Sequence, residues 1–455
     1  MRKIAIYIVC FILSVFMYIY APRDYDFTFI LCATLLFVFP SICSLVKDFK
    51  QDGLMTFNMF FLVAYFFVSY AYPLFIINSP LQDFFVGIYD YIDYSVSSRC
   101  AALCTLGISS YLVAYEQYRG KKVNFQRWVK IVRFNGIKII YIITFVAVLL
   151  KTVLYMRSTN GIAIESGFWG ILYEASFCVY LVYNCKKVTC CNFVSFIRIN
   201  ALPLISCLIL MLLFLVAGDR GLIITCGLII LGVYWFFVSR IKIWWLLSGL
   251  FAGVLLMFII QQTRTTDSSL STGDAGGFVS EAASAMSETT SGLMFFSDFL
   301  IIHRELYLGY EYYQKYGTSY PLQIFIVPFY PLPFVPSLIS QMLFGKIPND
   351  IKPGVILNDY ISYTGYGHLG IHAVSDLIMR FGYVGLIGFF FLWGYVVARI
   401  SASRNTGILG AALFIMILSQ AIYVPRAPIV DQVKVLADVV IIVWLSTLIS
   451  KISLR

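Results

Sequence analysis

The sequence predicts an all-α polytopic membrane protein with about twelve transmembrane helices and one large external loop. Two observations carry this prediction. The chain has 455 residues, of which 60% are hydrophobic and only 12% charged, and its mean hydropathy is +0.85, whereas soluble domains carry about 25% charged residues. Its apolar residues also form long continuous runs instead of alternating with polar ones. This pattern favours helices over a β-barrel, because a helix satisfies its own backbone hydrogen bonds in lipid.

The first predicted span begins close to the N-terminus. Met1-Arg2-Lys3 precedes an apolar run from Ile4 to Tyr20. This run is longer than the roughly 7–15 residues of a signal-peptide core, and no small-x-small cleavage site follows it, so we interpret it as a span.

Further apolar runs have the length of membrane-crossing helices, roughly 17–25 residues. Together with the first span they make twelve, and they are Phe27–Val46, Leu54–Ile77, Ala101–Tyr115, Ile137–Met156, Phe168–Asn184, Leu202–Gly218, Leu222–Ser239, Ile243–Gln261, Tyr383–Ala398, Gly407–Tyr423 and Val433–Ile449. The run Leu322–Phe344 is also apolar, but four prolines interrupt it. Because proline removes backbone donors, we expect a re-entrant or interfacial segment there.

Basic residues indicate the orientation of these spans. They gather at the two termini and in the loops after spans two, four, six, eight and ten, namely at Arg2, Lys3, Lys47, Lys50, Arg119, Lys121, Lys122, Arg127, Lys130, Arg133, Lys138, Lys186, Lys187, Arg198, Arg240, Lys242, Arg399, Arg404, Lys451 and Arg455. By the positive-inside rule these loops and both termini are cytoplasmic. The formal net charge of +10 therefore reflects membrane topology and gives no support for nucleic-acid binding.

This topology divides the chain into three predicted regions. Residues 1–261 form nine transmembrane helices with short loops, residues 262–381 a large external loop with short helices and the proline-rich segment, and residues 382–455 three C-terminal transmembrane helices. The loop holds all three histidines, His303, His368 and His372, and none of the eleven cysteines. We therefore expect any chemistry in this loop and predict no disulfide or structural zinc framework.

Four arginines are predicted at the outer side, in separate parts of the chain. Arg220 lies in a Gly-Asp-Arg-Gly turn, Arg264 follows span nine, Arg380 ends the external loop, and Arg426 lies between Pro425 and Pro428. One interpretation is that each reaches lipid headgroups or pairs with a nearby aspartate. Their convergence favours an anion site instead, since arginine binds phosphate with a forked, bidentate geometry.

A glycine-rich segment at 365–370 leads into a predicted short helix that carries His372, Asp376 and Arg380 on one face. Phe381-Gly382 is expected to break this helix before the next span. A histidine oriented by a carboxylate could serve as a general base, so His368 and His372 are the candidate bases and Asp376 the candidate orienting group. An ordinary i,i+4 polar pair is the competing interpretation.

A metal site at His368, His372 and Asp376 is disfavoured because no fourth ligand is evident. His303, in the middle of the loop, is interpreted as a surface or packing residue.

Several short motifs resemble those of Wzy-type polymerases of O-antigen and capsular polysaccharide. The resemblance covers the chain from about Leu202 to its end, together with the overall pattern of spans. The motifs are the turn 218–221, Tyr316-Gly317-Thr318-Ser319-Tyr320 followed by Pro328, Lys352-Pro353, the entry 365–368, the step Arg380-Phe381-Gly382-Tyr383-Val384-Gly385 and a late outer Arg426.

The resemblance implies a GT-C-like bundle of the ligase and shape-elongation type in the bacterial inner membrane, with a periplasmic active site. It implies a glycosyltransferase that polymerises undecaprenyl-diphosphate-linked oligosaccharides, with one such molecule as donor and another as acceptor. Arg220, Arg264, Arg380 and Arg426 would hold the diphosphate without metal or other cofactor. A chain-length regulator is a further implied partner. The loop tyrosines would form either a sugar-stacking wall or an interfacial aromatic belt.

Two other functions remain open at this stage. An O-antigen ligase would share the architecture but transfer a finished chain to a lipid core. A flippase or transporter of lipid-linked glycan would have a similar number of spans, although the sequence lacks convincing repeated halves.

Overall fold

The structure is a computed structural model, and it describes residues 2–75, 94–125, 134–158, 167–187, 192–216, 221–242, 297–319, 335–346, 351–361 and 370–452, with a few isolated positions between them. All the regular structure in these ranges is helical. The chain divides into two compact units. Unit 1 comprises Met1–Val123, Asp298–Ser403 and Gln420–Lys434, and unit 2 comprises Asn124–Ser297, Arg404–Ser419 and Val435–Arg455.

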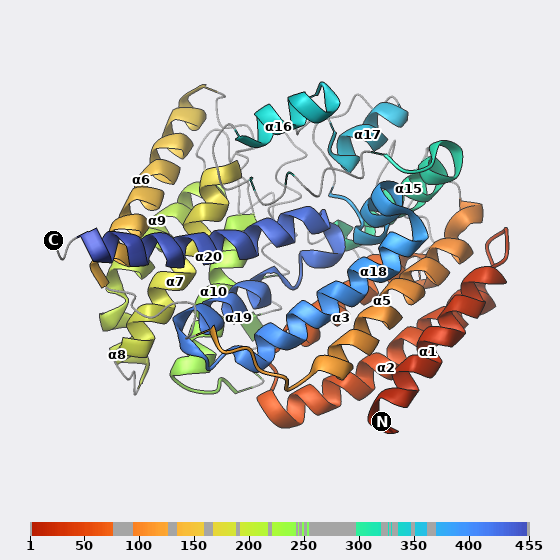
Figure 1. The fold of residues 1–455 in the computed structure, drawn as a ribbon, viewed down its shortest axis with the longest axis horizontal. Coiled ribbons are helices and arrows are strands. Elements are labelled where there is room, and N and C mark those ends of the chain that lie inside the picture. The colour runs from red at the N-terminus through yellow and green to blue at the C-terminus, as the bar shows by residue number, and fades with distance from the viewer. Residues whose placement is uncertain are drawn as a thin grey trace, which may run out of the picture. The chain divides into compact units, whose positions relative to one another are not determined.

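Unit 1 is built around helix α5 (Ser97–Tyr118), which packs against α1 (Arg2–Ile19), α2 (Phe27–Asp52) and α18 (Ala373–Ser403), as Figure 1 shows. Almost every side chain of α5 from Ser97 to Tyr115 is buried. A helix whose side chains are buried on nearly all sides by other helices forms the core of a bundle.

A second run of unit 1 changes its helical geometry along its length. It begins as α3 (Phe57–Phe66), continues as the π-helical turn η1 (Phe67–Ala71) and ends as α4 (Tyr72–Phe75). Thr56 begins α3 by accepting a hydrogen bond from the Met59 backbone N–H, at 3.3 Å. Single π-helical turns are rare and occur frequently at functional sites.

Shorter helices from the predicted external loop complete unit 1. These are α14 (Ser297–Leu300), α15 (Ile302–Tyr316), α16 (Val335–Phe344) and α17 (Pro353–Tyr360), followed after α18 by the 3-10 turn η9 (Val424–Arg426). The first turns of α20 (Ile429–Ile452) also belong to unit 1. Helix α15 packs against α18 and α17. Most of the proline-rich segment before α16 lies outside the described residues, so its re-entrant character stays a prediction.

The break expected at Phe381-Gly382 is confirmed. Gly382 has φ +66° and ψ −166° inside α18, which divides that element into two helical stretches. A β-carbon at Gly382 would lie 3.0 Å from the hydroxyl of Tyr313. Glycine adopts this backbone conformation without the steric cost that other residues incur.

Unit 2 contains α6 (Phe134–Ser158), α7 (Gly167–Lys187), α8 (Phe193–Ile199), α9 (Ala201–Val216), α10 (Gly221–Phe237), α19 (Gly407–Gln420) and the rest of α20. Helix α7 packs against α6 and α10. The short helix α8 meets α9 at a bend of 82°. Asn192 caps α8 through a reciprocal pair of hydrogen bonds with Ser195, which stabilises the first turn of a helix.

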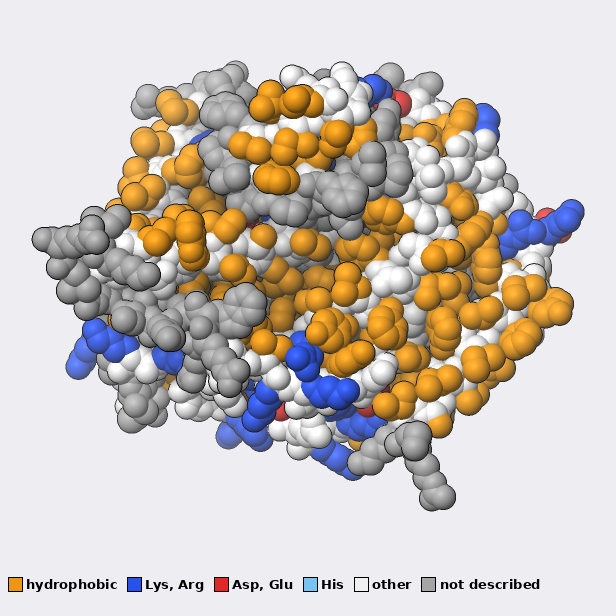
Figure 2. Space-filling model, in the orientation of Figure 1, with side chains coloured by type: hydrophobic (Ala, Val, Ile, Leu, Met, Phe, Trp, Pro, Cys, Tyr) orange, Lys and Arg blue, Asp and Glu red, His pale blue; other side chains and the backbone are white. Residues whose placement is uncertain are grey.

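Large apolar side chains cover the outward faces of α1 and α2. They include Phe16, Leu35, Phe39 and Phe49, each more than half exposed, and Figure 2 shows hydrophobic side chains over both helices. Soluble proteins rarely expose contiguous apolar patches of this kind. Together with six helices that are long and apolar enough to cross a bilayer, they make this chain a helical membrane protein.

Every predicted span except Ile243–Gln261 coincides with a helix or a continuous helical run. The six long apolar helices are Phe27–Asp52, Phe57–Phe75, Tyr94–Tyr118, Gly136–Leu154, Ala373–Ser403 and Asp431–Ser450, and the bent pair α8–α9 is a seventh if counted as one span. Three further predicted spans correspond to shorter apolar helices, which are Ile4–Ile19, Gly221–Phe237 and Gly407–Gln420. Most of Ile243–Gln261 lies outside the described residues, and the count of twelve stays a prediction.

Candidate functional site

Four of the seven predicted site residues lie in unit 1, in or near the first turns of α18 and α20. They are His372, Asp376, Arg380 and Arg426. His368, Arg220 and Arg264 lie outside the residues that the structure describes. The described residues therefore include only one part of the predicted site.

Loops of unit 1 that share a predicted side of the membrane lie against one another. At the predicted outer end, the Asp26 backbone N–H donates to Ser98 Oγ at 2.9 Å, and a β-carbon on Gly370 would lie 2.5 Å from the Arg426 carbonyl oxygen. At the predicted inner end, Arg119 pairs with Asp48 at 2.6 Å. The outer loops and the inner loops therefore form two separate ends of unit 1. Which of the two ends faces the cytoplasm stays a prediction.

His372 begins α18 as its cap. Its carbonyl oxygen accepts from the Asp376 N–H at 2.9 Å, and its Nδ1 accepts from the Val374 N–H at 3.1 Å. Because Nδ1 is an acceptor, the proton of the neutral ring lies on Nε2, which donates to Ser69 Oγ at 3.0 Å. Burial, with a smaller contribution from nearby His303, holds the pKa of His372 well below its ordinary value. His372 is therefore neutral at pH 7, and both of its ring nitrogens are engaged.

His303 approaches the same π-helical turn from α15. Its Nδ1 donates to the Leu300 carbonyl at 3.0 Å, and its ring packs 5.4 Å from that of Tyr72. Burial lowers the pKa of His303 to about 4. Of the two interpretations offered by the sequence, surface or packing, the structure supports packing, because His303 is fully buried.

Asp376 does not orient His372, which corrects the predicted His–Asp arrangement. Its Oδ1 accepts from Arg380 Nε at 2.6 Å, and its Oδ2 accepts from the Ile429 backbone N–H at 3.1 Å. The physical reason is that Asp376 lies one turn below the capping residue, where the i,i+4 arginine and the first N–H group of α20 satisfy both oxygens. The i,i+4 pair that forms here joins Asp376 to Arg380 instead of His372, and it is buried and not on a solvated face.

Arg426 differs from Arg380 in having no carboxylate partner in the described part of the chain. Its guanidinium lies 5.3 Å from the ring centroid of Phe299 and 6.0 Å from that of Tyr423. Its Nη1 is buried and has no hydrogen-bond partner among the residues with described positions, while the residue as a whole is partly exposed. Aromatic rings hold a guanidinium in place without neutralising it, so Arg426 retains its charge for an anion.

Other charged groups lie near the start of α20. Asp431 interacts electrostatically with Lys352, Lys434, Asp376 and Arg380. Lys352 is exposed and directly precedes α17. An exposed lysine in this region would attract an anion.

Two charged features of this region were not predicted from the sequence. Arg99, near the start of α5, contacts the neutral hydroxyl of Tyr310 at 3.4 Å. The position of Arg99, directly after a predicted outer loop, could have marked it as a further arginine at the outer end. Arg304 and Glu305 form a pair in α15 at 2.5 Å, with both side chains buried. Burial raises the pKa of Glu305, and the charge of Arg304 opposes this. The sequence does not indicate this burial, because an adjacent arginine and glutamate in a predicted loop are expected to be exposed.

The loop tyrosines fall into two groups. Tyr307 and Tyr310 are buried in α15. Tyr312, Tyr316 and Tyr360 form a cluster with ring centroids 4.9–5.9 Å apart, and Tyr316 is 55% exposed. The second group suits either the sugar-stacking wall or the aromatic belt that the sequence predicts.

Among the residues with described positions, no group of three or more His, Cys, Asp or Glu side chains is arranged to hold a metal ion. Since His368 is not among them, the disfavoured His368–His372–Asp376 metal site is not tested. Compared with known proteins, the chain matches no family model, no curated protein and no solved structure.

Proposed function

We propose that this protein is a glycosyltransferase that polymerises undecaprenyl-diphosphate-linked oligosaccharide repeat units, as its resemblance to Wzy-type polymerases implies. Under this proposal the twelve spans form a GT-C-like bundle in the bacterial inner membrane, with the active site at the periplasmic face. The single observation that supports it best is Arg426, an arginine held by two aromatic rings and without a carboxylate partner in the described residues.

The reaction needs a cation at this place. As the glycosidic bond of the donor breaks, negative charge develops on the leaving lipid diphosphate. Fixed positive groups aimed at that charge stabilise the transition state and need no reorganisation when the bond breaks. A guanidinium donates two parallel N–H groups to phosphate oxygens. Arg426 and the exposed Lys352 supply this chemistry, and Arg220 and Arg264 are proposed to add to it.

The buried pair Asp376–Arg380 takes a positioning role in this proposal. Asp376 binds the Ile429 N–H at the start of α20, three residues after Arg426. Arg380 neutralises Asp376 and therefore keeps this buried carboxylate charged and able to accept. The pair therefore connects α18 to the segment that carries Arg426. In this proposal Arg380 positions that segment and is no longer a ligand of the diphosphate.

The acceptor hydroxyl must lose a proton, and we propose His368 as the base. His372 is less suited, since its Nδ1 accepts from Val374 and its Nε2 donates to Ser69. A general base needs a free lone pair within hydrogen-bond reach of the proton that it removes. His372 is instead proposed to fix the start of α18, which follows the segment containing His368.

The experiment that tests this function supplies purified lipid-linked repeat units, together with lipid A core, to the purified full-length protein reconstituted in vesicles. A ladder of lengthening glycans on the lipid is the expected product. Transfer to a lipid A core would identify a ligase, and movement of the lipid across a vesicle without a new glycosidic bond would identify a flippase. Either result would overturn the polymerase assignment.

A further inference from the structure

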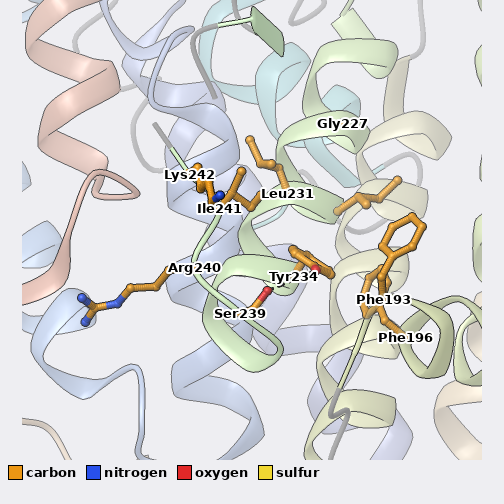
Figure 3. A pocket seen from close by; sticks show the side chains of 10 residues that line it. Phe193, Phe196, Gly227, Leu231, Tyr234, Ser239, Arg240, Ile241 and Lys242 are labelled. Atoms are coloured by element: carbon orange, nitrogen blue, oxygen red, sulfur yellow. Dashed lines mark hydrogen bonds between the residues drawn. The ribbon is translucent and has the colours of Figure 1, made fainter. Parts of the chain in front are cut away.

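A cavity of about 800 Å³ lies in unit 2, between α8, α10 and the segment that follows α10 (Figure 3). Its lining residues are Phe193, Phe196, Gly227, Ile230, Leu231, Tyr234, Ser239, Arg240, Ile241 and Lys242. The volume is within the range of roughly 300–1,000 Å³ that small-molecule sites occupy. None of these residues belongs to the candidate site of unit 1.

The inner part of the cavity is apolar and aromatic. The Tyr234 ring packs edge-on against Phe193 and Phe196, with centroids 6.0 and 5.5 Å apart. Ser239 Oγ donates to the Tyr234 hydroxyl at 3.1 Å, which occupies the polar end of this tyrosine. A β-carbon on Gly227 would meet nothing within 4 Å. The cavity is therefore open beside this glycine and suits a hydrocarbon chain.

Two cations form the polar part of the lining. Arg240 and Lys242 are both exposed, the lining contains no carboxylate, and neither makes an ion pair with a carboxylate in the described ranges. In Figure 3 Lys242 lies near Leu231 and Ile241, while the Arg240 side chain extends away from the aromatic rings. An apolar cavity with two unneutralised cations at its edge matches a ligand with a hydrocarbon chain and an anionic head.

The bend between α8 and α9 indicates the depth of this cavity in the bilayer. With α9 as the predicted span Leu202–Gly218, α8 is bent from it by 82° and runs nearly along the membrane surface, because spans tilt by about 20° on average. Phe193 and Val194 on α8 are 59% and 63% exposed, as in helices that lie at the lipid interface. The cavity is thus at the level of the headgroups.

We propose that this cavity binds an acidic phospholipid of the leaflet on the predicted cytoplasmic side. An acyl chain packs against Phe193, Phe196 and Tyr234, and the phosphate lies beside Arg240 and Lys242. Basic pockets between helices on that side are a recurring way to bind anionic headgroups. Charge complementarity, the shape of the cavity and the interfacial position of α8 each support this occupant. The competing explanation is that Arg240 and Lys242 serve only the topology of the chain and the C-terminal dipole of α10.

The test titrates delipidated full-length protein in detergent with phosphatidylglycerol or with phosphatidylcholine and measures retained lipid by native mass spectrometry. We expect phosphatidylglycerol to be retained at concentrations at which phosphatidylcholine is not. The double variant Arg240→Ala/Lys242→Ala should weaken retention about thirtyfold, since each of the two cations near an anionic surface contributes on the order of 1 kcal/mol. Gly227→Leu should also weaken it by filling the cavity with both cations intact, whereas Gly227→Ala should bind nearly as the unaltered protein does.

The matched control is Lys121→Ala/Lys122→Ala, which removes two exposed cations from the same predicted side but outside the cavity. It should leave retention unchanged. Equal retention of the two lipids, an equal loss in the control, or retention that withstands both the double variant and Gly227→Leu would each overturn the proposal. Stronger retention of a lipid diphosphate than of phosphatidylglycerol would overturn the assigned occupant. None of these outcomes depends on glycan polymerisation.

Discussion

The two ends of unit 1 both bury charged side chains, but they balance them differently. At the predicted inner end, Lys47 pairs with Glu116 at 2.7 Å, and Arg119 bridges Glu116 and Asp48 at 3.1 and 2.6 Å. Two cations therefore meet two carboxylates. At the predicted outer end, Asp376 pairs with Arg380 at 2.6 Å, whereas Arg426 lies over aromatic rings and has no carboxylate partner in the part of the chain that the structure describes.

This difference separates a structural charge network from a binding site. The inner network also satisfies its carboxylates with neutral groups, since Asn58 and Tyr115 donate to Asp48 at 2.8 and 3.0 Å. A buried network in which every charge is compensated rigidifies a fold. A partly exposed guanidinium that has no counter-charge among the described residues contributes no ion pair to the fold and stays available to an anion. We therefore expect inner substitutions to affect folding and outer ones to affect activity.

The largest expected effect is on folding, at the inner end. Arg119→Ala leaves the buried carboxylate of Asp48 without its cation, while Glu116 keeps Lys47, and breaking such a buried pair from one side costs about 3–5 kcal/mol. Thermal unfolding of the detergent-solubilised variant should occur at a markedly lower temperature. Glycan elongation per folded molecule should stay near the unaltered level. An unchanged unfolding temperature would contradict the structural role.

The next effect is on activity, at the outer end. Arg426→Ala should reduce the rate of elongation about 100-fold, which corresponds to ~2.7 kcal/mol of lost transition-state stabilisation. Thermal unfolding should be unchanged, since Arg426 has no ion pair to lose among the described residues. Arg426→Lys should retain part of the rate, because lysine keeps the charge without the fork. The rate is measured from the glycan ladder over time.

A pH titration of stability sharpens the comparison further. Burial lowers the pKa of His303 to about 4, whereas an unfolded histidine has a pKa of about 6.5. The unfolded chain therefore binds the proton more tightly, so stability is complete above pH 6.5 and falls as the pH drops toward 4. At pH 5 the loss from His303 is about 2 kcal/mol, and buried His372 acts in the same direction.

The matched variant for this titration is His303→Asn, whose amide can still donate to the Leu300 carbonyl but does not titrate. Its unfolding temperature should fall less between pH 7 and pH 5 than that of the unaltered protein. Identical pH dependence in the two proteins would show that His303 is not buried in its neutral form.

The smallest expected effect is that of Arg23→Ala. Arg23 is an exposed arginine between α1 and α2, at the same predicted end as Arg426. Its removal takes away one positive charge without touching the group around Asp376. Elongation and thermal unfolding should both remain within error of the unaltered protein. A loss comparable to that of Arg426→Ala would mean that general surface charge, and not a specific site, supports the reaction.

Much of the helical architecture could be predicted from the sequence, since continuous apolar runs have few alternatives in lipid. The break at Gly382 could also be predicted, because Phe381-Gly382 interrupts a pattern with a four-residue period. The hydrogen-bond partners of Asp376 could not be predicted from the sequence. His372 and Arg380 lie four residues to either side of it, and only the fold determines that His372 caps α18 and turns its ring toward Ser69. Likewise, no local pattern predicts that α15 buries His303 and Arg304.

The measurement that tests the central claim most directly is the affinity of the purified protein for an undecaprenyl-diphosphate-linked glycan, compared between the unaltered protein and Arg426→Ala. The account predicts saturable binding that weakens at least about tenfold in the variant, as expected for the loss of a charge-assisted, bidentate contact, with the unfolding temperature unchanged. Equal affinity of the two proteins, or no binding by the unaltered protein, would contradict the claim that the outer end of unit 1 holds the diphosphate.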